Sequence, residues 1–149
     1  MACPFCAIGA GTARASFVYT DDEVLAFMDI RPVSPGHVLI VPREHFASFS
    51  DVPPAIAAHM FLVAQRLADA VRRSGVRCEG ILLTLADGAA AGQEVPHCHL
   101  HVIPRFAGDN YRLSVEWSNP ARAELDALAL EIARLHGYSP PPLTDEEGN

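Results

Sequence analysis

The sequence has no long apolar segment and no export signal. Its apolar runs stay short of the ~18 residues that cross a bilayer, and its first residues lack the basic and then apolar pattern of a signal peptide. We therefore expect a cytoplasmic protein that does not associate with membranes. In that compartment the 4 Cys are expected to be reduced, buried or bound to a metal rather than paired in disulfides.

Positive charge is also scarce. The chain has 11 basic and 18 acidic side chains and a formal net charge of −7. No basic stretch is long enough to follow a phosphate backbone, so the sequence does not predict general nucleic-acid binding. Any site for a phosphate group must therefore be local.

The length of 149 residues suits one domain with its own core. No internal repeat with a period of about 20–50 residues is present. We expect residues 1–138 to form this domain. Residues 139–149 are rich in proline and acidic side chains, so we expect them to form a flexible tail.

Short segments of alternating or continuous apolar character predict strands. Residues 17–19 and 24–28 flank Asp21 and Asp22 and predict a β-hairpin. Further strands are expected over residues 37–42, 81–85 and 96–103, and the segment 81–85 is expected to be buried.

Two amphipathic patterns predict helices. The first begins near Pro53 and Pro54, which suit a first helical turn, and ends at Gly75. Its apolar stripe is Ile56, Met60, Val63, Leu67 and Val71. A second helix with Leu125, Leu128, Ile132 and Leu135 on one face ends at Gly137. Because the strands come in a run with one helix inside it and one after it, the pattern favours an α+β fold over a doubly wound parallel sheet.

Three histidines, His97, His99 and His101, alternate with apolar residues. Residues two apart in a strand lie on one face, about 6.6–6.8 Å from each other. The imidazoles would therefore form a row while Cys98, Leu100 and Val102 point into the core. A neutral imidazole can attack phosphorus and form a covalent intermediate, and a neighbouring ring can hold phosphate oxygens. A chance row on a solvated face is the alternative.

A second candidate site lies at the start of the chain, where Cys3 and Cys6 form a C-x₂-C pair. Two thiolates with this spacing can hold one Zn²⁺ if two further ligands complete the tetrahedron. A redox pair and a chance spacing are the alternatives.

The histidine row and several further blocks resemble the histidine triad (HIT) family, whose signature is His-x-His-x-His followed by two apolar residues. The blocks stand in the family's order over about residues 3–105, and the main ones are Asp21–Ile30, Pro32–Pro42 and Ala91–Arg105. The resemblance implies an antiparallel sheet of about five strands packed on helices and continuous across a homodimer.

The resemblance also implies roles for individual residues. His99 would attack the α-phosphate of a purine nucleotide and form a nucleotidyl-histidine that water hydrolyses. His101 and Gln93 would bind phosphate oxygens or the leaving group, and His37 would support the triad, of which His97 is the first member. The implied substrate-binding residues are Asp29 for the ribose, Phe5, Ile8, Phe27 and Ile30 for the base, and Gly92.

In zinc-bearing members of the family, a histidine after the Pro-Gly-His strand and the first histidine of the triad join the C-x₂-C pair. These positions are His45 and His97 in this sequence. With Cys3 and Cys6 they imply a closed site for structural Zn²⁺, which would place His99 rather than activate water. A catalytic zinc with an open position is the alternative.

The implied activity is hydrolysis of a phosphoramidate, a dinucleoside polyphosphate or an adenylate ester at the α-phosphate. The alternatives are a nucleotidyltransferase with a phosphate or sugar-phosphate acceptor, and a zinc-stapled nucleotide-binding module with negligible turnover. Two positions depart from the family: Ala86 stands where many members have Asn, and Glu94 where some have a small hydroxyl residue. A further hypothesis is that the segment with Trp117 approaches the partner's active site in the dimer.

Overall fold

The computed structural model describes residues 3–139 and residue 141. Contacts among them define two compact units, one ending at Tyr111 and the other beginning at Arg112. Apart from residues 139 and 141, the predicted tail lies outside the described residues. None of the helices in the described part of the chain is long and apolar enough to span a membrane.

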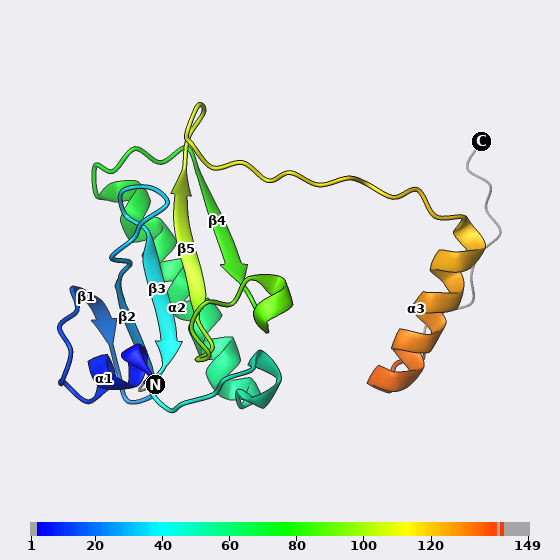
Figure 1. Ribbon diagram of the computed structural model, residues 1–149, viewed down its shortest axis with the longest axis horizontal. Helices are drawn as coiled ribbons and strands as arrows, with labels where there is room; N and C mark the ends of the chain where they lie inside the picture. The colour runs from blue at the N-terminus through cyan, green and yellow to red at the C-terminus, as the bar shows by residue number, and fades with distance from the viewer. Residues whose placement is uncertain (1–2, 140, 142–149) are drawn as a thin grey trace. The chain divides into compact units, whose positions relative to one another are not determined.

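The first unit is built around one antiparallel sheet of five strands (Figure 1). The order across the sheet is β1-β2-β3-β5-β4, and every neighbouring pair is antiparallel. This architecture confirms the predicted α+β class. The strands are β1 (Phe17–Thr20), β2 (Val24–Met28), β3 (Val38–Pro42), β4 (Gly80–Leu85) and β5 (Leu100–Arg105).

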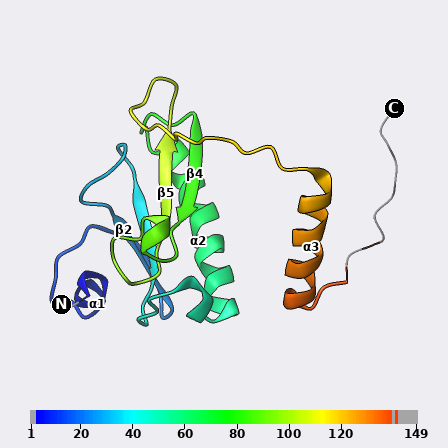
Figure 2. The ribbon, with the colours of Figure 1, turned by 45° about the vertical axis from the view of Figure 1, so that its right-hand side comes forward.

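Two helices, α1 (Pro4–Gly9) and α2 (Pro54–Arg73), lie on opposite sides of this sheet (Figure 2). Pro53 is the N-cap residue of α2, and proline also occupies the first turn, where a missing N–H costs nothing. The helix ends before Gly75, which has a φ of +83°. The predicted extent of this helix is therefore confirmed.

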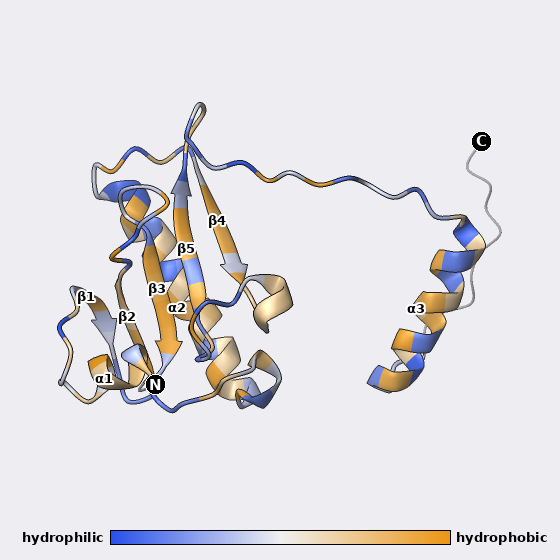
Figure 3. Ribbon diagram, in the orientation of Figure 1, coloured by the Kyte–Doolittle hydropathy of each residue, from blue (hydrophilic) through white to orange (hydrophobic). Residues whose placement is uncertain are grey.

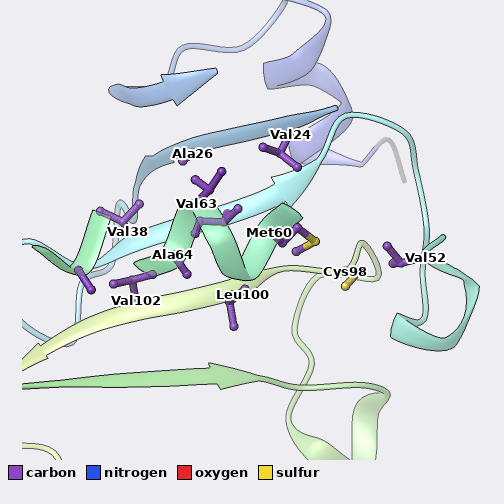
Figure 4. Close-up of a cluster of buried hydrophobic side chains, with 12 residues drawn as sticks. Val24, Ala26, Val38, Val52, Met60, Val63, Ala64, Cys98, Leu100 and Val102 are labelled. Atoms are coloured by element: carbon purple, nitrogen blue, oxygen red, sulfur yellow. The ribbon is translucent and has the colours of Figure 1, made fainter. Parts of the chain in front are cut away.

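Alternation along the strands divides the apolar side chains between two clusters. Met60 and Val63 of α2 pack against one face of the sheet, where Leu100 and Val102 of β5 point (Figure 4). On the other face Leu25, Phe27, Leu39 and Val41 pack against Phe5 of α1. The catalytic candidates therefore have to share the second face with α1.

The turn that joins β2 to β3 is held by a glycine. Gly36 has a φ of +89°, and a Cβ there would lie 3.1 Å from Pro104 and 3.2 Å from Val76. Only glycine adopts this conformation without strain and fits the space. The turn brings Asp29 opposite His37, whose carbonyl oxygen accepts the Asp29 N–H at 3.0 Å. β3, which follows, is buried throughout and apolar along its length (Figure 3).

The predicted strand over residues 96–103 is wrong at its start, because β5 begins at Leu100. Leu100 is the first residue of β5 that pairs with β3 and β4. Just before it, Cys98 donates its N–H to the carbonyl of Phe46 at 2.6 Å, so the backbone follows a loop and not a neighbouring strand. The predicted inward direction of Cys98, Leu100 and Val102 is nevertheless confirmed.

The expectation that residues 81–85 are fully buried is also wrong. β4 is an edge strand of the sheet, and Leu83 is 39 % exposed. An edge strand has a neighbour on one side only, which leaves more of its side chains in contact with solvent.

A polar network ties the β1–β2 hairpin to α2. The Asp21 carboxylate accepts hydrogen bonds from the Tyr19 hydroxyl and from His59 of α2. Burial raises the pKa of Asp21, but these bonds and two from the backbone outweigh it, and the net effect lowers the pKa well below its usual value. The carboxylate is therefore ionised at neutral pH and joins two elements that lie on either side of the core.

The second unit contains one helix, α3 (Arg122–His136), among its described residues. Gly137 ends it in the left-handed conformation, with a φ of +81°, as predicted. The apolar stripe of the helix is exposed, and Leu128, Ile132 and Leu135 are each more than half accessible. The predicted helix is thus confirmed, and no other helix or strand among the described residues of its unit covers that stripe.

Candidate active site and metal cluster

A pocket of about 610 Å³ opens on the α1 face of the sheet. Its walls come from α1, the end of β2, β3, the loop before β5, and β5 itself. Two of the three triad histidines line it, His99 and His101, whereas His97 does not. The other predicted site residues in its lining are Phe5, Ile8, Phe27, Asp29, Ile30, His37 and Gly92.

His99 is oriented by a main-chain carbonyl. Its ring Nδ1 lies 2.7 Å from the carbonyl oxygen of His97. Because a carbonyl oxygen only accepts, Nδ1 carries the proton of the neutral ring and Nε2 holds its lone pair. His99 is 5 % exposed yet lines the pocket, and Phe5 packs edge-on against its ring with centroids 5.3 Å apart. The neutral form of His99 is therefore the Nδ1–H tautomer, with Nε2 as the acceptor nitrogen.

His101 is oriented by a relay from the other strand. The N–H of Val33 donates to His37 Nδ1 at 3.1 Å, so the proton of a neutral His37 is on Nε2. That Nε2 lies 2.9 Å from His101 Nδ1 and donates to it. The proton of neutral His101 is then on Nε2. The two pocket histidines are thus held in opposite states, with an acceptor nitrogen on His99 and a donor nitrogen on His101.

Burial keeps the relay neutral. Burial is the largest cause that lowers the pKa of His101, and the electrostatic effects of His99 and His37 add to it. The charges of Asp29 and Glu94 act in the opposite direction, and the net pKa is about 4. Burial also lowers the pKa of His37, again against Asp29. Both rings are therefore uncharged at pH 7, which is the state that the hydrogen-bond pattern requires.

Asp29 sits beside this relay at the end of β2. One carboxylate oxygen accepts the Arg31 N–H at 2.8 Å, and the other lies 3.6 Å from His37 Nε2. The turn therefore fixes the carboxylate within the pocket wall, next to the histidines.

Aromatic side chains form the apolar end of the pocket. The rings of Phe5 and Phe27 pack with centroids 5.6 Å apart, and both residues are buried. Ile30 is 92 % exposed, so it stands at the rim of the pocket rather than inside it. Sequence reasoning missed Val95, which also lines the pocket. Its place in the run before His97 was the only available signal.

Gln93 is engaged by the backbone of two loops. Its side-chain oxygen accepts the Gly88 N–H at 2.8 Å, and its amide nitrogen donates to the Ala47 carbonyl at 2.8 Å. It is absent from the described lining of the pocket. In this arrangement Gln93 holds the loop that carries Gly92 and Glu94, and one N–H of its side-chain amide is not used by these two bonds.

The four predicted metal ligands come together beside the pocket. The ligand atoms of Cys3, Cys6, His45 and His97 all lie within 4.8 Å of one another. Each sulfur has a histidine Nδ1 at 3.3 Å, that of His97 for Cys3 and that of His45 for Cys6. Tetrahedral Zn²⁺ with usual bond lengths places sulfur and nitrogen ligands roughly 3.6 Å apart. The donor set and its spacing therefore fit zinc and leave no open position.

His97 has the tautomer that a metal ligand needs. Its Nε2 donates to the Pro42 carbonyl at 2.9 Å, which leaves the Nδ1 lone pair directed at the two thiols. The side chain of His97 therefore belongs to the metal cluster, while its carbonyl oxygen orients His99. This one residue links the cluster to the pocket.

Asp87 is absent from the described lining of the pocket. Its carboxylate accepts hydrogen bonds from Ser48 and from the backbone of Phe49. It therefore holds the short helix at residues 49–51 and does not replace the amide that Ala86 lacks.

The chain is similar in sequence to known proteins. The HIT domain family matches residues 10–108. An uncharacterized HIT-like protein of Mycobacterium tuberculosis is 44 % identical over 129 residues, which are 87 % of this chain and 88 % of that protein. An adenylylsulfatase of Arabidopsis thaliana is 35 % identical over 107 residues, 72 % of this chain and 54 % of that protein.

Solved structures show the same similarity. The crystal structure of a HIT family protein from Bacillus subtilis has a TM-score of 0.82 and 31 % identity, and the match covers 90 % of this chain and 96 % of that one. A zinc-bound histidine triad family protein from Mycobacterium smegmatis has a TM-score of 0.72 and 40 % identity, with coverage of 92 % and 97 %.

The relay predicts the protonation behaviour of His101. In an NMR titration that detects imidazole nitrogens, we expect the His101 midpoint near pH 4 and the Nε2–H tautomer at pH 7. Replacing His37 with Phe removes the donor to Nδ1, so both tautomers of His101 should then be populated. An Nδ1–H tautomer in the unaltered protein, or a midpoint at the usual value near 6.5, would contradict the relay.

Proposed function

The chain belongs to the HIT domain family, and on that premise we propose that it is a hydrolase that cleaves a purine nucleotide at the α-phosphate through a covalent nucleotidyl-His99. The bond between His99 Nδ1 and the His97 carbonyl is the observation that carries this proposal. It supports a nucleophilic Nε2 inside a pocket of nucleotide size. The substrates we propose are a phosphoramidate, a dinucleoside polyphosphate or an adenylate ester.

In the first step, the bond from His99 Nε2 to phosphorus forms as the bond from phosphorus to the leaving group breaks. His101 Nε2–H donates a hydrogen bond to the departing atom, which takes a proton from solvent. In the second step, water attacks the same phosphorus and releases a proton to solvent, and the His99–phosphorus bond breaks. Each proton is accounted for, and a covalent adduct divides one difficult displacement into two easier ones.

Substrate binding uses the two ends of the pocket. We propose that the aromatic end, with Phe5, Phe27 and Ile8, holds the base, with Ile30 at its rim. Asp29 is proposed to accept hydrogen bonds from the ribose hydroxyls, since its carboxylate lines the same pocket beside His37. Gly92 lines the same pocket in the loop that precedes the triad. This arrangement would place the α-phosphate beside His99 and His101.

We propose that the Cys3, Cys6, His45 and His97 cluster binds one structural Zn²⁺. A closed tetrahedral site supplies folding free energy and no catalytic water. Its effect on the reaction would act through His97, because a side chain fixed at the cluster also fixes the carbonyl that orients His99.

We also propose that two copies associate through the edge of the sheet at β4. Leu83 of β4, with Phe61 and Leu62 of α2, is exposed around a hollow of about 550 Å³. An exposed apolar edge strand pairs readily with another strand, and pairing of β4 with its copy would continue the sheet and cover this patch.

The covalent step predicts a trapped adduct. Mixing the protein with adenosine 5′-phosphoramidate and quenching in milliseconds should give an acid-labile adenylyl group on His99, detected by mass spectrometry, with turnover that needs no added acceptor. His99→Ala should show no adduct and lose at least about 10³-fold in kcat/KM. Retention of the metal by this variant shows that the site is folded. Undiminished turnover by His99→Ala would remove the proposal.

The zinc proposal predicts metal content and stability. The unaltered protein should hold one Zn²⁺ per chain, and the Cys3→Ser/Cys6→Ser variant should hold none and melt at a lower temperature, as measured by elemental analysis and calorimetry. Cys78→Ser is the matched control, because Cys78 is half-buried and lies outside the cluster, and it should keep its zinc. Stoichiometric zinc in the double variant would exclude the assignment.

The association proposal predicts a change of mass. Leu83→Arg should convert a dimer to a monomer in light scattering, since it places charge in the apolar patch. Val18→Arg, at the similarly exposed opposite edge of the sheet, should leave the dimer intact. Dimers of equal stability in both variants would show that β4 is not the interface.

A further inference from the structure

An ion pair crosses the mouth of the pocket. Arg31, two residues after Asp29, pairs with Glu94 in the loop before β5, and the atoms Nη2 and Oε2 lie 2.5 Å apart. Both residues line the pocket, although they are 63 positions apart in the sequence. Their side chains are 78 % and 72 % exposed, so the pair is open to solvent on its outer side.

The charges around the pocket balance. Its described lining contains two cationic side chains, Arg14 and Arg31, and two anionic ones, Asp29 and Glu94. The chain has no lysine that could add to them, and the buried His37 and His101 are neutral at pH 7. The pocket therefore has no surplus of positive charge, and the charge of Arg31 is already matched by Glu94.

Glu94 is also close enough to act on the donor ring. Glu94 and His101 line the same pocket, and the charge of Glu94 counteracts the effect of burial on the pKa of His101, whose Nε2–H is proposed to bond to the leaving group. A leaving group bound at His101 would therefore lie in the field of Glu94.

We infer that Glu94 is a specificity-determining residue that selects leaving groups by charge. It disfavours anionic leaving groups, such as a polyphosphate or sulfate, and favours amines that carry an additional positive charge. This inference rests on the proposed function, which it narrows to nucleoside phosphoramidates of neutral or cationic amines. Glu94 need not touch the reacting atoms to have this effect.

The two members of the ion pair act on charged leaving groups in opposite directions. Exposed pairs of this kind hold together weakly, so a charged leaving group can compete for either partner. A cationic amine can take the place of Arg31 beside Glu94. An anionic group must displace Glu94 from Arg31 while being repelled by it. Removing Glu94 and removing Arg31 should therefore shift the preference in opposite directions.

The test uses three adenosine 5′-phosphoramidates of similar size, made with ethylenediamine, n-propylamine and β-alanine. At pH 7 the ethylenediamine leaving group carries an additional positive charge, the n-propylamine group carries none, and the β-alanine group carries an additional negative charge. At low ionic strength, kcat/KM of the unaltered protein should fall in that order. In Glu94→Gln, the ratio of kcat/KM for the β-alanine substrate to kcat/KM for the ethylenediamine substrate should rise about tenfold, the order of magnitude for the loss of one nearby charge. In Arg31→Gln the same ratio should fall.

Two readouts separate charge selection from a structural effect. The n-propylamine substrate should change by less than about threefold in both variants, because its leaving group carries no additional charge. The shift in ratio should also shrink in about 1 M salt, where the Debye length is about 3 Å.

The outcomes distinguish this inference from the proposed function. If the unaltered protein hydrolyses all three substrates but Glu94→Gln leaves their ratios unchanged, charge selection by Glu94 is wrong while the hydrolase assignment stands. If the kcat/KM ratio of the β-alanine and ethylenediamine substrates is the same in Arg31→Gln as in the unaltered protein, the proposed competition of leaving groups for the ion pair is wrong. If the unaltered protein hydrolyses none of the three, the inference about Glu94 is wrong, because it confines the substrate to phosphoramidates, and the proposed hydrolase keeps only dinucleoside polyphosphates and adenylate esters as substrates.

Discussion

The site depends on one hydrogen bond, between Nδ1 of His99 and the carbonyl oxygen of His97. A carbonyl cannot donate, so this bond alone decides which nitrogen of His99 carries the proton and which one faces the pocket. The relay from Val33 through His37 gives neutral His101 the opposite arrangement. Its Nδ1 accepts from His37, so its proton is on Nε2. An acceptor and a donor therefore stand side by side in one pocket, and each is set by its partner on the far side of the ring.

That hydrogen bond needs a rigid His97, and several parts of the fold supply it. The Pro42 carbonyl at the end of β3 holds one ring nitrogen, and the thiols of Cys3 and Cys6 surround the other. The next residue, Cys98, is fixed through its N–H to Phe46 and through its buried side chain. The C-x₂-C pair at the start of the chain is thus joined to the reactive histidine through a single residue. A metal at this cluster would act on geometry, in keeping with a closed ligand set.

Patterns with a local cause could be predicted from the sequence. The strands of the hairpin, α2 with its prolines and Gly75, and the alternation of Cys98, Leu100 and Val102 follow from periodicity and caps. The resemblance to the HIT family, which is confirmed, placed His45 beside the cysteines. Features that depend on distant contacts could not be predicted. β5 begins late because its pairing with β3 and β4 starts only at Leu100. β4 is exposed because it is an edge strand, and Gln93 and Arg31 have partners 46 and 63 residues away. Nothing in a linear pattern identifies such partners.

The central claim is that His99 bonds to phosphorus before water does. Its most direct measurement is the stereochemistry at that atom, with an adenosine 5′-phosphorothioate amidate of one configuration hydrolysed in isotopically labelled water. Each in-line displacement inverts the configuration, so attack by His99 followed by attack by water predicts retention. Inversion would show a single direct attack by water and would contradict the account.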